Sequence, residues 1–376
     1  MLEVLRIFGR LGLTSFGGPV AHLAFFRAEL VQRRGWLEEA EFADTVALCQ
    51  LLPGPSSSQV AVCLGSYRAG PAGAVAAWLG FTLPSALLMA AWAYGLEALP
   101  AGNWLHGLKL VTLAVVAQAV WSMGRQLCPD RLRRLLALLI GVLALAYPSF
   151  YGQLASLVVG ALVGLACYAQ TDPVGPASRP AGLPARGSLL ALGLFVSLLV
   201  LAHLWPAPES TFFLTGSLVF GGGHVILPLL ENAVCGPGWV STDVFLAGYG
   251  AAQAVPGPLF SFGAYLGTVI GGWPRGCSCL VALYLPSFLL LGAVLPHWHR
   301  WRRSRWLRSA LVGVNAAVVG LLLAALLGPV GTQTITGPQD VLLAGLAWLL
   351  LRRGAPPWLV VLLGAGYGTI STGQGH

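Results

Sequence analysis

Long apolar stretches follow one another along almost the whole chain, with short polar segments between them. Eight stretches that have a charged residue at both ends contain no Asp, Glu, Lys or Arg over 21 to 37 residues; the shortest lies between Glu209 and Glu231, and the longest between Arg134 and Asp172. A helix needs about 20 residues to cross the hydrocarbon core of a bilayer. The strands of a membrane barrel would alternate apolar and polar residues, which these stretches do not. The pattern predicts an all-α polytopic membrane protein with about 10–13 hydrophobic segments.

Composition and charge support this fold class and narrow the function. Hydrophobic residues make up 56% of the 376 positions and charged residues 9%, whereas soluble domains carry about 25% charged residues. The net charge of +8 comes from Arg residues and a single Lys in short loops. Basic residues in short loops are typical of membrane-protein loops that face the cytoplasm rather than of a protein surface that binds nucleic acid. The seven cysteines form no CxxC pair, so neither a metal site nor a disulfide framework is expected.

Motifs of soluble catalysis are missing. The sequence has no HExxH, no phosphate loop, no GxSxG and no GxGxxG that could open a βαβ unit. We therefore expect no cofactor and no ATP-driven transport by this chain alone. A secondary transporter fits these absences, and an intramembrane enzyme or a non-transporting membrane scaffold is the alternative.

Four landmarks occur twice, in the same order. The second copies follow the first by 202 to 204 residues. The pairs are Phe16–Pro19 with Phe220–Gly223, Trp36 with Trp239, Gln50–Pro55 with Gln253–Pro258, and Leu83–Ser85 with Leu285–Ser287. We interpret them as two halves of six hydrophobic segments each, residues 1–170 and 207–376. Residues 171–206 contain a linker rich in Pro, Gly and Arg and then one extra apolar segment, Ser188–Trp205.

The extra segment predicts that the second half is inverted, because it adds one crossing of the membrane. Loop charges agree, since Arg125–Arg134 holds four Arg where Gly328–Asp340 has none. The loop Arg27–Arg34 holds three Arg, whereas its counterpart Glu231–Gly238 has no basic residue; a third pair, Glu97–Leu105 and His299–Arg308, shows the opposite bias. Basic loops face the cytoplasm. An inverted repeat is typical of secondary transporters, whose substrate site lies near the midplane between the repeats.

Two segments are expected to be broken or re-entrant. Pro53-Gly54-Pro55 lies in the middle of the segment between Asp44 and Arg68. There the prolines remove backbone donors and the glycine permits a turn. The basic loops Arg27–Arg34 and Arg125–Arg134 are both expected on the cytoplasmic side, so the chain must cross the membrane an even number of times between them. Three apolar segments lie between these loops, so one of them must enter and leave on the same side. The break recurs in the segment between Asp243 and Arg275. Whether the first two segments of each half span or re-enter is left open.

The helix starts that follow these breaks are the predicted substrate site. A helix that begins inside a membrane presents unpaired N–H groups and the positive end of its dipole, which suit an oxyanion. A purely structural role of Pro, Gly and Ser in membrane helices is the alternative. The candidate binding residues are Phe16, Gly17, Gly18, Pro19, Gln50, Pro53, Gly54, Pro55, Ser56, Ser57, Ser58, Gln59, Gly221, Gly222, Gly223, His224, Gln253, Pro256, Gly257, Pro258 and Ser261.

Four charged residues near the first break are candidates for charge compensation or coupling. Arg27 and Arg68 flank the broken segments and could attract an anion, although loop arginines also act as topology signals. Glu41 and Asp44 could carry a coupled proton, or could complement the dipole at a helix start. Both interpretations stay open for each residue.

The chain resembles the chromate ion transporter family over nearly its whole length. The resemblance rests on Phe16-Gly17-Gly18-Pro19, Arg34-Gly35-Trp36-Leu37, Gln50-Leu51-Leu52-Pro53-Gly54-Pro55 and the second copies Phe220–His224 and Ala254–Pro258. It implies a multi-pass carrier of the bacterial inner membrane that exports chromate, a tetrahedral dianion similar to sulfate, driven by the membrane potential or a proton gradient. The expected partners are this oxyanion and the lipid bilayer, with no nucleic acid, and a homodimer is left open. The second half departs from the pattern by having Gly223 where the first has Pro19.

Overall fold

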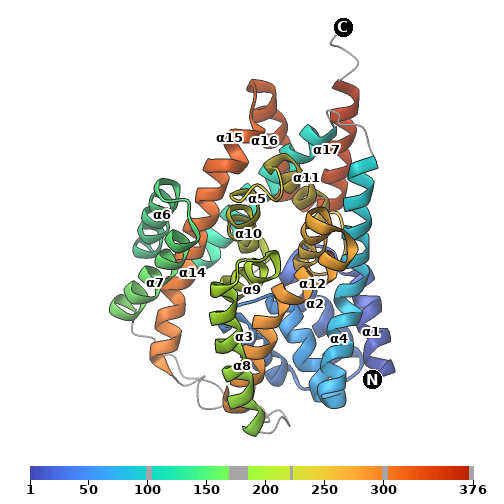
Figure 1. The fold of residues 1–376 in the computed structure, drawn as a ribbon, viewed down its shortest axis with the longest axis vertical. Helices are drawn as coiled ribbons and strands as arrows, with labels where there is room; N and C mark the ends of the chain where they lie inside the picture. The colour runs from blue at the N-terminus through green and yellow to red at the C-terminus, as the bar shows by residue number, and fades with distance from the viewer. Residues whose placement is uncertain (99–103, 169–184, 221–222, 299–303, 372–376) are drawn as a thin grey trace.

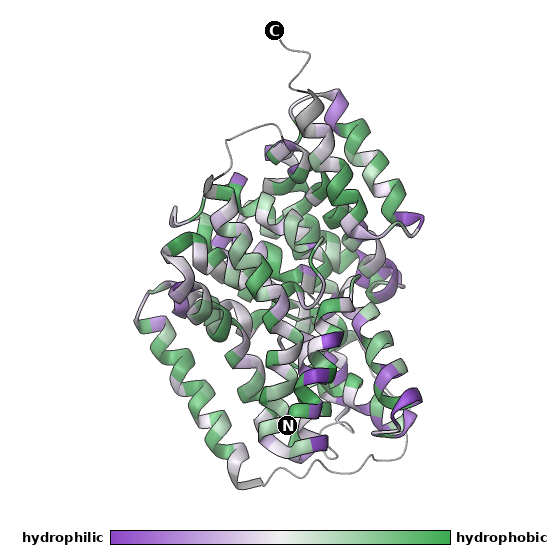
Figure 2. Cartoon of the chain, turned by 90° about the vertical axis from the view of Figure 1, so that its right-hand side faces the viewer, coloured by the Kyte–Doolittle hydropathy of each residue, from purple (hydrophilic) through white to green (hydrophobic). Residues whose placement is uncertain are grey.

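The computed structural model describes residues 1–98, 104–168, 185–220, 223–298 and 304–371. Within these ranges the chain is helical and contains no strand, which confirms the all-α prediction (Figure 1). Five helices in the described part of the chain are long and apolar enough to cross a membrane. Hydrophobic residues cover most of the helices, and hydrophilic residues gather at a few helix ends (Figure 2). The predicted multi-pass membrane protein is therefore supported by both helix length and composition.

The first half of the chain forms seven α-helices and one π-helical turn, η1. They are α1 (Leu2–Thr14), α2 (Gly18–Phe26), η1 (Arg27–Arg33), α3 (Glu39–Leu51), α4 (Ser56–Ala98), α5 (Trp104–Leu127), α6 (Arg131–Ala146) and α7 (Phe150–Cys167).

The second half follows a similar order after the extra helix α8 (Ala185–Leu204). Its elements are α9 (Pro208–Leu218), η2 (Gly223–Val225), α10 (Ile226–Cys235), α11 (Thr242–Ala252), η3 (Leu259–Ser261), α12 (Phe262–Val294), η4 (Leu295–His297), α14 (Arg305–Ala325), η5 (Leu326–Val330), α15 (Gly331–Thr334), α16 (Pro338–Arg352) and α17 (Pro357–Ser371). The extra apolar segment predicted at Ser188–Trp205 is thus present as α8. Most of the predicted linker and part of the basic loop His299–Arg308 lie outside the described residues.

The long helix α4 is bent back on itself near its start. Its backbone leaves the helical region at Ala69 and Gly70. A Cβ atom on Gly65 would lie 2.3 Å from the carbonyl oxygen of Gly73, so the legs on either side of the turn are in close contact. A similar turn at Gly271 and Gly272 divides α12. Each long helix therefore consists of a short first leg and a long second leg.

Helix lengths show how the broken segment between Asp44 and Arg68 is built. α3 has 13 residues, which at 1.5 Å per residue span about 20 Å, less than the roughly 30 Å of the hydrocarbon core. The first leg of α4, residues 56–68, is equally short. Non-helical backbone separates the two at residues 52–55. The prediction of a broken segment is confirmed, because neither piece is long enough to cross the bilayer alone.

The second legs of α4 and α12 pack against each other and run antiparallel. Tyr94, near the end of α4, accepts a hydrogen bond at its hydroxyl from the N–H of Trp273, at the start of the second leg of α12 (2.8 Å). Further along, the ring of Trp78 contacts that of Phe288 with centroids 5.5 Å apart. Near the opposite ends, Pro71 and Leu295 line the same apolar cavity.

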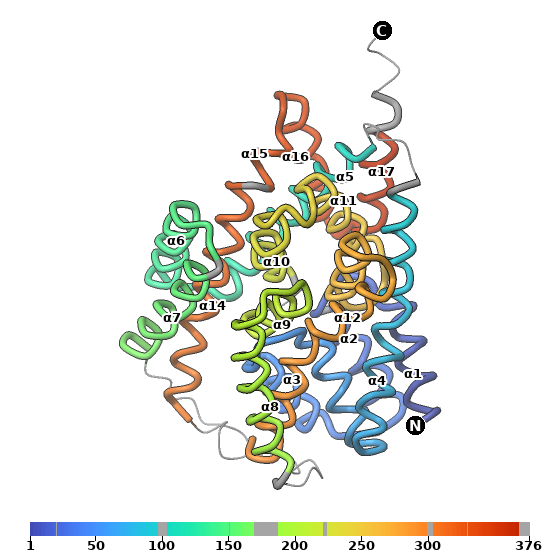
Figure 3. The backbone as a smooth tube through the Cα atoms, in the orientation of Figure 1, coloured from blue at the N-terminus to red at the C-terminus, as the bar shows by residue number. Residues whose placement is uncertain are grey.

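Two further helices exchange partners between the halves. α14 packs on α6 and α7 of the first half, while α5 packs on α16 and α17 of the second half (Figure 3). Small residues allow the close approach: a Cβ on Gly160 would lie 2.7 Å from the carbonyl oxygen of Gly313, and one on Gly364 would lie 3.0 Å from that of Gly107. Small residues are typical of helix contacts in membranes. The two halves are therefore interlocked.

Candidate functional site

The first Pro-Gly-Pro break touches the second half through Gly54. Gly54 has φ +123°, a conformation that favours glycine. Its N–H donates to the carbonyl oxygen of Val219, the residue after α9 (2.6 Å). A Cβ at this position would lie 2.5 Å from Oγ of Ser287 on α12. The break therefore needs a glycine both for its backbone angle and for its close approach to the other half.

The second break touches the first half in the same manner through Gly257. Gly257 has φ +98°, and its N–H donates to the carbonyl oxygen of Ser15, the residue after α1 (2.9 Å). A Cβ at Gly257 would lie 3.0 Å from Oγ of Ser85 on α4. Each break is thus hydrogen-bonded to the chain of the opposite half, and the two bonds form a crossed pair.

The segment that follows Ser15 is a further helix break. Gly17 and Gly18 have φ +100° and +77°, and Pro19 occupies the first turn of α2. In the second half, η2 begins at Gly223, and the candidates Gly221 and Gly222 lie outside the described residues. The crossed hydrogen bonds therefore bring the ends of several short helices together inside the protein.

The larger of two polar cavities at this junction has a volume of about 290 Å³. A single water needs only about 10–15 Å³ on such a measure. Six predicted site residues line the cavity: Gly17, Gly18, Pro19, His224, Gln253 and Gly257. Nδ1 of His224 lies 2.9 Å from the hydroxyl of Tyr249. Nε2 of Gln253 is buried and makes no hydrogen bond of ordinary geometry with the described residues.

A smaller cavity of about 130 Å³ lies beside the first break. It is lined by four predicted residues, Pro19, Gln50, Gly54 and Ser56. Ser56 is the first residue of α4, where backbone N–H groups have no partner within the helix. The described residues that line the two cavities include no Asp, Glu, Lys or Arg. Apart from the imidazole of His224, the donors in the described linings are therefore neutral groups.

Three other polar residues, which follow the first break on α4, are buried in the protein and stabilise the break through hydrogen bonds. Ser57 Oγ lies 3.2 Å from Nδ1 of His22, and Ser58 Oγ lies 3.5 Å from the hydroxyl of Tyr284. Gln59 donates from Nε2 to the carbonyl oxygen of Pro53 (2.8 Å). These three residues are almost fully buried. Sequence reasoning grouped them with the site, and the structure places them outside the linings of the two cavities.

The remaining candidates of this group differ in their surroundings. Ser261 is buried at the end of η3, and Phe16 is half-buried between α1 and α2. Pro53, Pro55, Pro256 and Pro258 lie in the two breaks, where they interrupt the helical backbone.

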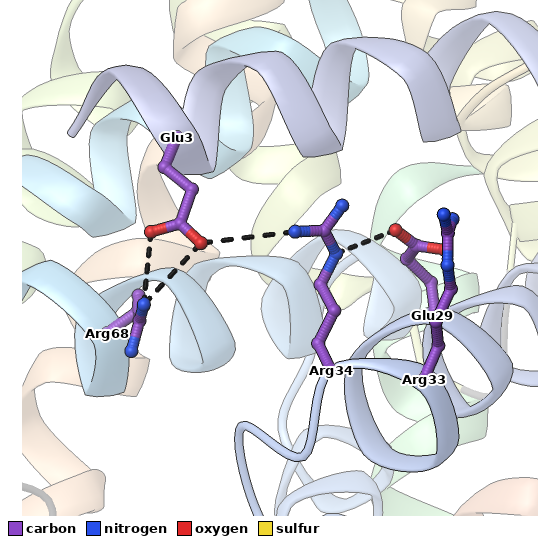
Figure 4. A network of polar contacts seen from close by, with 5 residues as sticks. All are labelled: Glu3, Glu29, Arg33, Arg34 and Arg68. Atoms are coloured by element: carbon purple, nitrogen blue, oxygen red, sulfur yellow. Dashed lines mark hydrogen bonds and ion pairs between the residues drawn. The ribbon is translucent and has the colours of Figure 1, made fainter.

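Arg68 belongs to a surface network of charged residues (Figure 4). Its guanidinium lies 3.1 Å from the Glu3 carboxylate, which in turn is 3.9 Å from Arg34. Arg34 and Arg33 both donate to Glu29. Partial burial raises the pKa of Glu29, but the hydrogen bonds from Arg34 and Arg33 outweigh it and hold that pKa below its ordinary value. The network joins α1, η1 and the first leg of α4.

The other charged candidates also have partners outside the two cavity linings. Arg27 forms an ion pair with Glu39 at the start of α3. Glu41 accepts a hydrogen bond from the N–H of Glu38 (3.1 Å) and so caps α3. Asp44 lies in the second turn of the same helix. Exposed ion pairs of this kind contribute about 0–1 kcal/mol each.

Sequence reasoning missed the contribution of two long helices. Gln118, Ser122 and Gln126 of α5 line the cavities, and so does Asn315 of α14. The signal was available in the spacing, because polar residues four positions apart share one helix face. His22 and Tyr249, which hold Ser57 and His224, were also missed. Among the described residues, no group of three or more His, Cys, Asp or Glu is placed to hold a metal ion.

Broken helices around polar cavities, inside a bundle of apolar helices, define a multi-pass membrane protein with an internal site, as transporters have. Irregular backbone is tolerated at such depth only where protein buries it or where it lines a cavity. The family described as "Chromate transporter" matches residues 2–165 and 209–369. The chain belongs to the chromate transporter family, and it is accordingly a membrane transporter and not an enzyme.

Curated relatives match over nearly the whole chain. A chromate transport protein of Pseudomonas aeruginosa is 29% identical, with 97% of this chain and 90% of the relative covered. A probable chromate transport protein of Synechococcus elongatus is 25% identical, with 96% and 93% covered. A chromate transport protein of Cupriavidus metallidurans is also 25% identical, with 93% and 88% covered. No solved structure matches the chain.

Proposed function

We propose that the chain is a secondary transporter that exports chromate, or a similar tetrahedral oxyanion such as sulfate, across the bacterial inner membrane. Membership of the chromate transporter family and the names of three relatives support chromate as the substrate. Neutral amide, hydroxyl and backbone donors line the two cavities. Such donors can replace the hydration shell of an anion without holding it so tightly that it cannot leave.

The observation that carries the proposed site is the crossed pair of hydrogen bonds from Gly54 to Val219 and from Gly257 to Ser15. It gathers helix breaks of both halves at one place, beside the larger cavity. Helix starts orient N–H groups and positive dipole ends toward an anion. In this proposal Gly17, Gly18, Gln253 and His224 surround the substrate.

The two halves, residues 1–170 and 207–376, are proposed to form an inverted repeat joined by residues 171–206. The antiparallel packing of α4 on α12 supports this arrangement. These helices carry the matching landmarks Leu83–Ser85 and Leu285–Ser287, and an axis in the membrane plane would make equivalent helices antiparallel. The exchange of partners by α5 and α14 supports the same arrangement.

The membrane potential alone could drive export of a dianion. With the cytoplasm negative, each charge that moves out through about 100 mV gains about 2.3 kcal/mol, so two charges gain about 4.6 kcal/mol. At about 1.4 kcal/mol per tenfold ratio, this free energy sustains a concentration gradient of roughly three decades. A proton gradient is the other proposed source.

Purified protein in liposomes tests this function directly. We expect labelled chromate to move when a potential is imposed, and sulfate to compete with it. Gln253→Leu should slow transport about tenfold or more, because a hydrogen bond to a charged group contributes about 1.5–3 kcal/mol. Gln333→Leu is the matched control, since Gln333 is exposed on α15 and lines neither cavity.

The outcomes separate the function from the site. Wild-type liposomes that move no oxyanion would contradict the proposed function. Normal transport by Gln253→Leu would remove the site assignment while leaving the function in place.

A further inference from the structure

The two polar cavities share one wall, although they contain different parts of the broken helices. Pro19 lines both of them. The larger cavity contains Gln253 and His224 of the second half, whereas the smaller contains Gln50 and Ser56 of the first half. The first turn of α2 is therefore the point at which the cavities meet.

One face of α5 extends along both cavities. Gln118 and Ser122 line the larger cavity and Gln126 lines the smaller one. Residues four positions apart lie on the same helix face, and at 1.5 Å per residue Gln118 and Gln126 are about 12 Å apart along the axis. The cavities thus follow one another along α5.

Several polar groups along the two cavities can bind a substrate. Nε2 of Gln253 is a buried donor with no hydrogen-bond partner among the described residues. Oε1 of Gln118 is a buried acceptor in the same state, so the group that this amide offers to an anion is its Nε2. The side chains of Gln126 on α5 and Asn315 on α14 make no hydrogen bond with the part of the chain that the structure describes. Polar side chains in membrane helices usually bond to neighbouring helices. Gln118 and Asn315 are partly buried and Gln126 is exposed near the end of α5, so these amides take no part in helix packing and are accessible to a substrate.

We propose that the oxyanion crosses the protein between these two cavities along the Gln118–Ser122–Gln126 face of α5, with Pro19 as the constriction. This inference rests on the proposed function. Gln118 binds the anion in the larger cavity, and Ser122 joins it when its hydroxyl turns away from the carbonyl oxygen of Ala119, to which it donates at 3.2 Å. Gln126 and Asn315 bind the anion in the smaller cavity. The anion thus occupies two successive stations, each with its own amide donors.

Gln126→Glu tests the second station, because it keeps the size of the side chain and adds a negative charge. We expect it to slow chromate transport in liposomes at least tenfold, while binding of labelled chromate to the purified protein changes less than threefold. Gln118→Glu, at the first station, should weaken both binding and transport at least tenfold. Gln126→Asn keeps the amide and should retain most of the transport activity. Gln333→Glu is the matched control and should behave as the wild type.

Three results would overturn the proposal. The first is wild-type transport by both Gln126→Glu and Gln126→Leu. The second is a loss of binding as large in Gln126→Glu as in Gln118→Glu, because it would indicate a single site. The third is a full loss of transport in Gln126→Asn, which would indicate a packing role. Absence of transport by the wild type would contradict the proposed function instead, so the two failures are distinguishable.

Discussion

At the scale of single residues, Gly54 and Gly257 decide how closely the halves approach. Both have positive φ, and both leave no room for a side chain against Ser287 and Ser85. These positions could be found from the sequence, because proline and glycine alter the backbone in ways that no other residue does. Gln118 and Gln126 could not be identified as readily, since a glutamine on a helix has the same backbone whether it binds a substrate or a neighbouring helix.

Gly54→Ala should destabilise the protein by about 1–3 kcal/mol, through the strained backbone and the displacement of Ser287. Thermal unfolding in detergent measures the effect. Gly193→Ala on α8 is the control, because nothing lies within 4 Å of a Cβ there and alanine favours a helix by about 0.5–1 kcal/mol. An unfolding temperature of Gly54→Ala equal to that of the wild type would show that the contact with Ser287 is not as close as described.

At the scale of elements, the broken helices were predictable and the turns inside α4 and α12 were not predicted. Pro53 and Pro55 identify the first break by chemistry alone. The dipeptide Gly70-Pro71 is typical of a turn, and the turn lies at Ala69 and Gly70. The charge of Arg68, by contrast, indicates only where an apolar segment ends. The geometry of the hairpin depends on the contact of Gly65 with Gly73. Two glycines at this spacing do not by themselves predict that the legs meet.

Cys49 and Cys63 offer a direct test of how α3 packs on the first leg of α4, on either side of the first Pro-Gly-Pro break. Cys49 lies on α3 and Cys63 on the first leg of α4, with their Sγ atoms 3.9 Å apart. In a variant whose other five cysteines are replaced by Ala, a mild oxidant should join the two thiols. Loss of maleimide labelling under denaturing conditions, with recovery after reduction, measures the bond.

The control for that experiment moves one thiol along the same helix. Leu48→Cys combined with Cys49→Ala turns the thiol to another face of α3 and should cross-link much more slowly. Equal rates for the two pairs would contradict the packing of α3 on the first leg of α4.

At the scale of the whole molecule, the order of helices follows from the repeated landmarks, whereas their packing does not. The sequence contains both copies of each landmark, which is why it predicts two halves. Nothing in it shows that α5 would pack on α16 and α17 of the other half. That choice depends on small residues such as Gly107 and Gly364, whose pairing becomes visible only in three dimensions.

An inverted repeat predicts that Arg131, at the start of α6, and Thr332, on α15, face opposite sides of the membrane. Both residues are exposed. Single cysteines at these positions, in a cysteine-free variant, can be labelled in intact cells with a membrane-impermeant maleimide. We expect Thr332→Cys to react from outside and Arg131→Cys only after permeabilisation. Labelling of both from the same side would contradict the inversion.

The crossed hydrogen bonds from Gly54 and Gly257 also indicate what the peptide connection between the two halves contributes. Each half supplies the carbonyl group that satisfies an amide of the other, and an unsatisfied amide in hydrocarbon costs several kcal/mol. If the backbone were severed between α7 and α8, neither fragment could complete its own interior. We expect the two fragments to remain associated as an obligate complex. The peptide connection then serves mainly to ensure that the two halves are made in equal amounts.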